Sequence, residues 1–225
     1  MTKRHSPDDV HRPHPVSGGP IVKLPTAFGD FVAQAWVDEE TGVEHFAVSS
    51  PMAPVDGTAP LVRLHSECLT GDVFGSYRCD CGEQLAYALE KIGQEGGTLL
   101  YLRGQEGRGI GLANKIKAYA LQEAGFDTVE ANEQLGLPVD ARSYRAAAQI
   151  LVEMGLTRIR LLSNNPDKKH RLADAGVVIV EMVPTEVPSR AENLRYLQTK
   201  KDRMDHRLTL EVRAATGPRR QRAAD

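Results

Sequence analysis

The residues of this sequence best suited to chemistry are three cysteines that lie close together, Cys68, Cys79 and Cys81. Thiolate sulfur is a soft ligand, and Zn²⁺ favours a tetrahedral set of such ligands. The spacing C-x10-C-x-C therefore predicts a metal site. With three protein ligands the fourth position would hold water, as in catalytic zinc sites, whereas His65 would have to close a structural site. Buried cysteines without a metal are the third reading that the spacing leaves open.

The odd number of cysteines and the carboxylate beside Cys68 also favour a metal site. Three clustered cysteines do not suit the disulfide framework of a secreted protein, and in a reducing compartment they favour a metal or redox centre. Glu67 directly precedes Cys68 and could carry a proton. Neither a closed structural zinc nor a set of metal-free cysteines accounts for that carboxylate.

A second candidate is a glycine-rich segment between a predicted strand and a predicted helix. Gly107, Gly109 and Gly111 would let the backbone approach a ligand, and the helix that follows would direct free N–H groups toward it. Arg103 and Arg108 suit phosphate oxygens. The segment has neither the P-loop ending nor the dinucleotide-binding spacing of glycines. An ordinary turn with solvated arginines remains the alternative.

Two further polar segments could contribute to a site. Residues 163–168 follow a predicted strand over 158–162, and ligands of open α/β sheets bind at the carboxyl ends of strands. A helix N-cap with Pro166 in the first turn would explain the same residues. Asp140, two residues before Arg142, could likewise do no more than cap a helix.

Hydrophobic periodicity predicts the elements that must position these residues. We expect strands over 28–37, 44–49, 61–64, 98–102, 158–162 and 177–183, and helices over 82–95, 110–124, 141–154, 167–175 and 192–206. The first two strands read as a hairpin, and the later alternation of strands and helices favours parallel pairing. The predicted fold class is α/β, a three-layer sandwich around a mixed β-sheet, in a single catalytic domain with flexible tails. Residues 1–20 are expected to be a disordered leader, 21–210 the catalytic domain and 211–225 a flexible basic tail.

Composition narrows the class of protein. The 225 residues include 28 Lys and Arg against 30 Asp and Glu, a net charge of −2, and aromatic residues make up 5%. Binding to nucleic acid through phosphates or stacked bases would favour a positive excess and more aromatic side chains. No stretch reaches the length of about 18 apolar residues that a membrane span needs, and the amino terminus lacks the apolar core of a secretory signal. We therefore expect a cytoplasmic protein that binds neither nucleic acid nor membrane.

The motifs resemble those of a known enzyme family. The segment Arg63-Leu-His-Ser-Glu-Cys-Leu-Thr-Gly-Asp72, followed by Arg78-Cys-Asp-Cys-Gly82, closely resembles the zinc segment of GTP cyclohydrolase II. Other motifs of that family follow in order: Gln105-Glu-Gly-Arg-Gly-Ile-Gly111, Asn114-Lys115, Tyr119-Ala-Leu, Asp127-Thr128 and Ser163-Asn-Asn-Pro166. The resemblance covers about residues 23–208, nearly the whole predicted domain.

The resemblance implies a reaction. The family opens the imidazole ring of GTP and releases formate and pyrophosphate, and its product is 2,5-diamino-6-(5-phospho-D-ribosylamino)pyrimidin-4(3H)-one, the first committed intermediate of riboflavin synthesis. It implies one catalytic Zn²⁺ per chain, Mg²⁺ on the triphosphate, and a homodimer. Some members carry a second enzyme ahead of this module, but only about 22 residues precede the matched region, too few for a domain of about 50 residues. We therefore expect a single activity.

The resemblance also implies roles for particular residues. The metal ligands would be Cys68, Cys79 and Cys81. GTP would be bound by Arg63, Leu64, His65, Ser66, Glu67, Gln84, Glu106, Gly107, Arg108, Thr128, Ser163 and Lys168. Asp140 matches the proton acceptor, Arg142 the proposed nucleophile, and Tyr119 a tyrosine near the base. Because arginine stays protonated in proteins, a clamp on the α-phosphate is the chemically better role for Arg142.

Departures from the family pattern, and rival functions, bear on the substrate. Ser163 replaces a common Thr and Gly104 is an extra residue, both near the predicted nucleotide, while Asp205 replaces a common Gly.

One rival function is that of a paralogue that serves a secondary pathway or stops at the formylated pyrimidine. A more distant rival is a zinc-stabilised protein that binds nucleic acid or senses redox state without catalysis.

Overall fold

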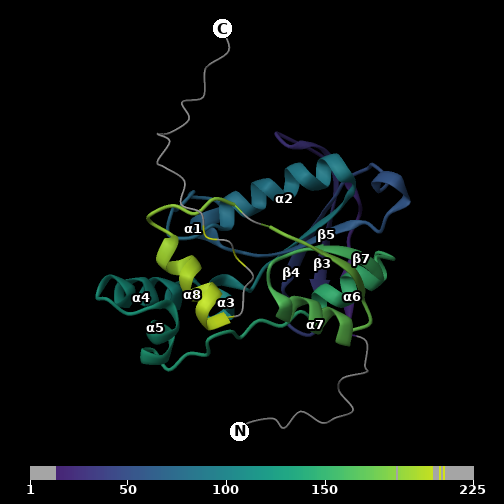
Figure 1. Ribbon diagram of the computed structural model, residues 1–225. Helices are drawn as coiled ribbons and strands as arrows, with labels where there is room; N and C mark the ends of the chain where they lie inside the picture. The colour runs from purple at the N-terminus through teal and green to yellow at the C-terminus, as the bar shows by residue number, and fades with distance from the viewer. Residues whose placement is uncertain (1–13, 186, 205–207, 209, 211–225) are drawn as a thin grey trace.

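Eight strands form one mixed β-sheet within residues 14–185, 187–204, 208 and 210, the part of the chain that the computed structural model describes (Figure 1). The strands are β1 (Val16–Gly18), β2 (Val22–Thr26), β3 (Gly29–Asp38), β4 (Glu44–Ser49), β5 (Leu61–Ser66), β6 (Gly97–Leu102), β7 (Arg158–Leu162) and β8 (Val178–Val183). Their order is β1-β3-β4-β6-β5-β7-β8, and β2 also pairs with β3. The pairs β5–β6, β5–β7 and β7–β8 are parallel, whereas the pairs made by β1 to β4 are antiparallel.

Helices cover both faces of this sheet (Figure 1). They are α1 (Leu69–Asp72), α2 (Cys81–Glu95), α3 (Glu106–Gly109), α4 (Leu112–Glu123), α5 (Thr128–Gln134), α6 (Arg145–Glu153), α7 (Pro166–Asp174) and α8 (Leu194–Met204), with a short 3-10 turn η2 (Val55–Gly57). Helix α2 lies on one face and α6 and α7 lie on the other. The expected three-layer α/β sandwich around a mixed sheet, in one domain, is confirmed.

Each face of the sheet has its own apolar core. On the α2 side, Ala88 and Ile92 pack against Phe31 and Leu99. On the opposite side, α6 contributes Ile150 and its neighbours to a larger cluster with strand residues of β5 to β7. These buried positions recur at the 3.6-residue period of a helix, which is why the sequence pattern located α2 and α6.

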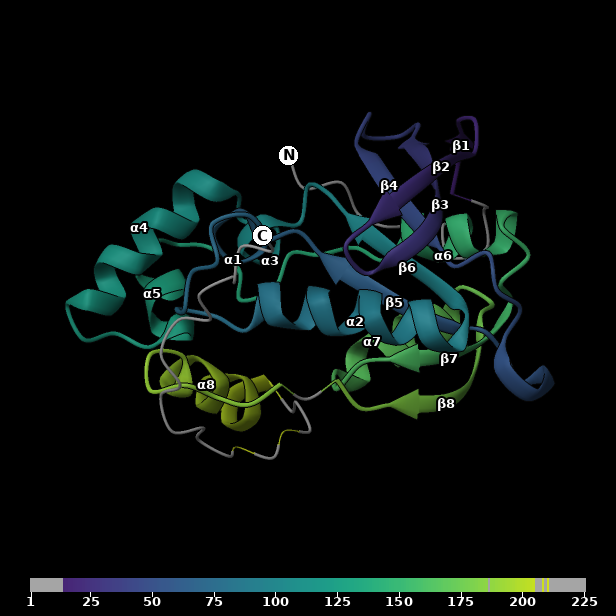
Figure 2. The ribbon, with the colours of Figure 1, turned by 90° about the horizontal axis from the view of Figure 1, so that it is seen from above.

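The parallel half of the sheet determines where a site can form. The carboxyl ends of β5, β6, β7 and β8 lie at one edge, and polar segments leave the sheet there. Figure 2 shows α4, α5 and α8 grouped beyond this edge, together with α1 and α3. Loops at this edge of an α/β sheet are the usual ligand-binding position.

The structure corrects two predicted boundaries. Residues 14–20, expected to be disordered, include β1, and the buried His14 imidazole lies 3.0 Å from Asp38 (Nε2 to Oδ1). A three-residue strand is too short to show a periodic pattern, so pairing with β3 was not visible in the sequence. The rest of the predicted leader (1–13) and the predicted tail (211–225) lie outside the described residues.

The second correction concerns the helix predicted over 141–154. The helix α6 begins only at Arg145, and Asp140 does not cap it. Instead Asp140 Oδ1 accepts a hydrogen bond from the backbone N–H of Arg142 at 3.0 Å. The short elements β2, α1, α3 and α5 were not predicted. No helix in the described part of the chain combines the length and apolar character needed to cross a membrane.

Candidate active site

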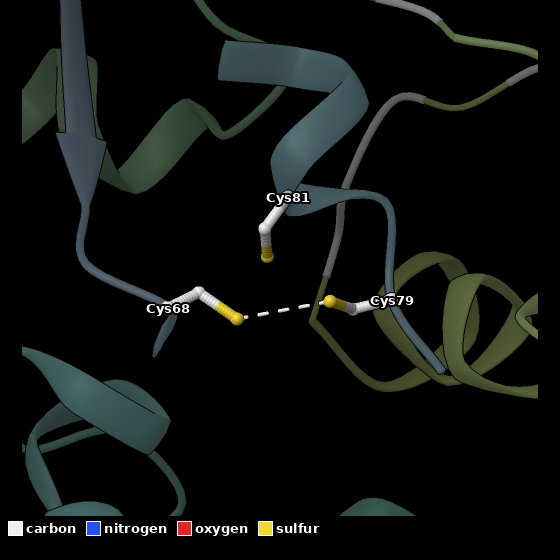
Figure 3. Close-up of side chains that lie close together, drawn as sticks. All are labelled: Cys68, Cys79 and Cys81. Atoms are coloured by element: carbon white, nitrogen blue, oxygen red, sulfur yellow. Dashed lines mark hydrogen bonds between the residues drawn. The ribbon is translucent and has the colours of Figure 1, made fainter. Parts of the chain in front are cut away.

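The three cysteines meet beyond the end of β5. Cys68 precedes α1, Cys79 lies in the loop that follows α1, and Cys81 is the first residue of α2 (Figure 3). Their sulfur atoms all lie within 4.8 Å of one another, and the Sγ atoms of Cys68 and Cys79 are 3.7 Å apart. Tetrahedral ligands at a Zn–S distance of about 2.3 Å would be separated by about 3.8 Å. The residues present therefore fit a metal ion bound by three thiolates.

The backbone around the cluster leaves room only for glycine at two positions. A Cβ atom on Gly71 would lie 2.8 Å from Cys79 Sγ and 3.2 Å from Cys68 Sγ, and one on Gly82 would lie 2.4 Å from the carbonyl oxygen of Gly71. The close approach of α1 and α2 is thus what brings the sulfur atoms together. Glycine at these two positions is a condition for the cluster.

The thiols perturb one another. Hydrogen bonds with Cys79 and Cys81 lower the pKa of Cys68, and the hydrogen bond with Cys68 raises the pKa of Cys79 to about 11. The cluster therefore loses its first proton at Cys68. A bound cation would draw off the remaining protons, because metal ligation requires thiolates.

His65 does not join the cysteines. Its Nε2 atom lies 3.1 Å from both carboxylate oxygens of Asp72, and its ring stacks on Tyr101. Burial lowers the pKa of His65, although Asp72 opposes this. Within the described residues the only group placed to hold a metal is the three cysteines. The reading in which His65 closes a structural zinc site therefore finds no support.

A cationic cavity adjoins the cluster. We use this name for a cavity lined by five cations, several polar residues and one leucine: Arg63, His65, Ser66, Cys81, Gln84, Arg108, Arg142, Ser163, Asn164, Asn165, Lys168, Thr185, Tyr196, Lys200 and Leu208. None of these described lining residues is an aspartate or a glutamate. Arg142 and Lys200 pair with Asp140 and Asp80, but no salt bridge among the described residues involves Arg63, Arg108 or Lys168. These three charges suit a ligand with several negative charges, such as a triphosphate.

Two of the cations are held by backbone oxygens at strand ends. Lys168 Nζ donates to the carbonyl oxygen of Leu64 at 2.8 Å, and Arg63 Nη1 donates to that of Leu162 at 3.0 Å. Burial, and then the nearby cations Arg63 and Arg142, lower the pKa of Lys168 well below its ordinary value. An anion in the cavity would reverse this effect by stabilising the ammonium.

Arg108 is the clearest sign of an anionic ligand. Its two terminal guanidinium nitrogens are buried and have no hydrogen-bond partner among the described residues. Its backbone also has a φ of 64°, in the left-handed region that favours glycine. A buried, unpaired guanidinium is costly and is seldom kept in a protein without a ligand.

The second cavity, here called the cysteine cavity, contains the cysteines. Its lining residues are Ser66, Glu67, Cys68, Cys79, Cys81, Gln105, Glu106, Gly107, Arg108, Ile110, Lys115, Ala118, Tyr119, Gln122, Thr128, Asn132, Arg142 and Tyr196. It shares Ser66, Cys81, Arg108, Arg142 and Tyr196 with the cationic cavity. The two cavities therefore adjoin as one site, with Cys68 and Cys79 at one end and Arg63, Lys168 and Lys200 at the other.

Asp140 and Arg142 form an ion pair at this junction. The guanidinium donates from Nε to Asp140 Oδ1 at 2.9 Å and from Nη2 to Oδ2, while Nη1 reaches Ser66 Oγ at 3.3 Å. Burial acts to raise the pKa of Asp140, but the bond with Arg142 outweighs it and lowers the pKa. The pair thus presents an oriented cation to both cavities.

Comparison with known proteins agrees with this geometry. The family model described as GTP cyclohydrolase II matches residues 20–184. The chain belongs to the GTP cyclohydrolase II family.

Its relatives include the riboflavin biosynthesis protein RibBA of Nocardia farcinica, 56% identical over 83% of this chain and 45% of the relative. The RibBA proteins of Rhodococcus erythropolis and Mycobacteroides abscessus are each 54% identical, over 83% of this chain and 45% and 46% of their own lengths. This cyclohydrolase II family chain therefore spans about half the length of these relatives. A solved structure, the two-domain 3,4-dihydroxy-2-butanone 4-phosphate synthase RibBX of A. baumannii, aligns with 69% of the chain at a TM-score of 0.39 and 16% identity, and we draw nothing from that likeness.

Most residues that the family resemblance implied do line the two cavities of this family member. Leu64 and Asp140 do not: the Leu64 side chain is buried in the core, and its carbonyl oxygen accepts a hydrogen bond from Lys168. Glu106 lines the cysteine cavity, but both of its carboxylate oxygens already have protein partners.

Sequence reasoning missed several lining residues. Lys115 was noted only as part of a motif, and Thr185, Tyr196 and Lys200 were not singled out. The last two lie four residues apart on α8, a spacing that puts them on one helix face. That spacing is a readable signal, but nothing in the sequence says that this face meets the site.

Proposed function

We propose that this chain is a GTP cyclohydrolase II, which opens the imidazole ring of GTP and releases formate and pyrophosphate. The observation that carries the proposal is the continuity of a five-cation cavity with a three-cysteine cluster. A nucleoside triphosphate has a matching arrangement, because its charge lies at one end and its base at the other. The product would be the diaminopyrimidine of riboflavin biosynthesis named above.

The cysteines are proposed to hold one Zn²⁺. The ion would supply Lewis acidity and make water reactive near neutral pH. The chain's own residues would place guanine C8 at the cysteine end of the site. Two hydrolytic steps at C8 release formate, and a third at the α-phosphate releases pyrophosphate.

The cations and hydroxyls of the cationic cavity would bind the triphosphate together with Mg²⁺. Lys168 and Arg108 provide charge, and Ser163 can hydrogen-bond through its hydroxyl, which also explains how it replaces the family's common Thr. Arg142 would clamp the α-phosphate while it remains protonated. Asp140 would orient that guanidinium. The proton-acceptor role that the family resemblance implies for Asp140 would require a bridging water, because Asp140 lines neither cavity.

Tyr119 would act at the base end. Its hydroxyl lies 3.4 Å from Thr70 Oγ1, and burial raises its pKa, so the phenol stays protonated. A neutral phenol can donate a hydrogen bond to the ring or to water. Glu67, in the lining of the same cavity, is the nearest carboxylate in sequence to Cys68 and is proposed to move protons there.

The test is a paired product measurement. Protein loaded with Zn²⁺ and given GTP and Mg²⁺ should release formate and pyrophosphate in equal amounts, and Cys79→Ser should release neither. Pyrophosphate without formate would instead favour the enzyme that stops at the formylated pyrimidine. Unchanged GTP would refute the proposal. A cytoplasmic location, expected from the sequence, and a homodimer, implied by the family resemblance, are part of the proposal.

A further inference from the structure

A buried lysine lies directly against one of the three cysteines. Lys115 is on α4, is 7% exposed and lines the cysteine cavity. Its Nζ atom is 3.1 Å from Cys68 Sγ, 2.9 Å from Thr70 Oγ1 and 2.6 Å from Glu106 Oε1. An ammonium has three donors, and here each one faces an acceptor. The geometry therefore suits a charged lysine whose direction is fixed by three bonds.

Glu106 holds this lysine in place. Its Oε1 also accepts from the N–H of Gly107 at 3.1 Å, and its Oε2 accepts from the N–H of Leu69 at 2.7 Å. The carboxylate thus ties the glycine-rich segment to the residue that follows Cys68. Because both oxygens are engaged, the Glu106 side chain is fixed against the lysine.

A merely structural role would not require these charges. A methionine is of similar length and would fill the same space without the cost of burying an ammonium and a carboxylate. The ammonium points at Cys68 alone among the cysteines, for no described hydrogen bond joins it to Cys79 or Cys81. The three sulfur atoms are therefore not equivalent.

We infer that Lys115 is a positioning residue of the metal centre, which donates a hydrogen bond to the Cys68 thiolate and is itself oriented by Glu106. This inference rests on the proposed function, since the cluster must hold a metal during turnover. A hydrogen bond to sulfur withdraws electron density from it, so the metal keeps more of its positive charge. Outer-shell partners of this kind typically change activity or metal affinity by about 10- to 100-fold.

The test replaces Zn²⁺ by Co²⁺, whose sulfur-to-metal charge-transfer absorption reports on the ligands without any turnover. The variants are Lys115→Met, which loses the donor, and Lys115→Arg, which keeps a cation. Lys117→Met is the matched control, because Lys117 is exposed on the same helix and lines neither cavity. Lys115→Met/Glu106→Gln removes the buried carboxylate charge that Lys115→Met alone would leave unpaired, so it gives a second test should Lys115→Met fail to fold.

We expect one Co²⁺ per chain in every variant, and a charge-transfer band moved to lower energy in Lys115→Met and in the double variant but not in Lys117→Met. In the Zn²⁺ enzyme, Lys115→Met should lower kcat about 10- to 100-fold and leave KM for GTP within about twofold. Lys115→Arg should recover part of the lost kcat. An unmoved band in both variants that lack Lys115 would overturn the inference. If the unaltered protein does not consume GTP, the proposed function fails, but the band comparison still tests the Lys115–Cys68 bond.

Discussion

Arg108 combines a strained backbone with a buried guanidinium whose terminal nitrogens lack partners among the described residues. Arg108→Gly should relieve the strain but remove the cation. Because a hydrogen bond to a charged group contributes about 1.5–3 kcal/mol, KM for GTP should rise roughly 10- to 100-fold. Arg108→Ala should weaken GTP binding as much. Its free energy of unfolding should be about 1 kcal/mol lower than that of Arg108→Gly, since alanine keeps the left-handed strain.

Urea unfolding of the ligand-free variants and steady-state kinetics would measure both effects. An Arg108→Gly protein with unaltered KM would contradict a phosphate-binding role for this side chain. Equal stability of the glycine and alanine variants would show that the backbone at this position is not strained.

The lowered pKa of Lys168 predicts that the affinity for GTP depends on pH. Its pKa is lowered mainly by burial and then by Arg63 and Arg142, so the free protein loses this charge below the ordinary lysine value. Below the lowered pKa the ammonium is present and ready for phosphate. As pH rises through it, binding must take up a proton and GTP affinity should fall, at pH values below the ordinary lysine pKa of about 10.4.

Titration calorimetry in two buffers of different ionisation enthalpy would detect that proton uptake. Lys168→Arg should remove both the uptake and the fall in affinity, because arginine stays charged. Affinity for GTP that is constant over this range in the unaltered protein would contradict the assignment.

At the scale of elements, helix α8 is fastened to the cysteine loop by a buried ion pair. Lys200 Nζ lies 2.8 Å from Asp80 Oδ1, and Asp80, between two of the cysteines, is only 1% exposed. Lys200→Met would leave that carboxylate without its cation, and we expect a loss of about 3 kcal/mol in the free energy of unfolding.

Arg203→Met is the matched control on the same helix. Arg203 pairs with Asp127 at 3.2 Å, but its side chain is 47% exposed, so its loss should cost less than about 1 kcal/mol. Denaturant unfolding of both variants makes the comparison. Similar losses in the two would show that α8 is not anchored through Asp80.

The elements also show how far the sequence could go. Long periodic segments such as α2 and the strands with apolar runs were predicted nearly to their ends. The helix α5 was missed although its capping box, Asp127 with Glu130, is a readable signal. The late start of α6 could not be read, because Asp140 bonds to Arg142 in a loop rather than capping the helix. Packing at the site determines that Asp140 pairs with Arg142 and does not cap α6.

At the scale of the whole molecule, the site joins residues from positions 63 to 208. Motif spacing predicted the cysteines and the glycine-rich segment, because their chemistry is local in the chain. Lys115 and Lys200 were not assigned roles, since each acquires one only when a helix packs against the cysteine loop. Strands β5 to β8 are parallel, so all four carboxyl ends lie at one edge of the sheet, and the segments that follow them bring the site residues together there.

The most direct measurement of the central claim is a crystal structure of the zinc-loaded protein with a slowly hydrolysed GTP analogue and Mg²⁺. The account predicts the triphosphate in the cationic cavity, in contact with Arg108 and Lys168, and guanine C8 facing a metal held by Cys68, Cys79 and Cys81. Phosphates at the cysteines with the base among the cations would contradict it. So would a fourth protein side chain bound to the metal while the analogue is present.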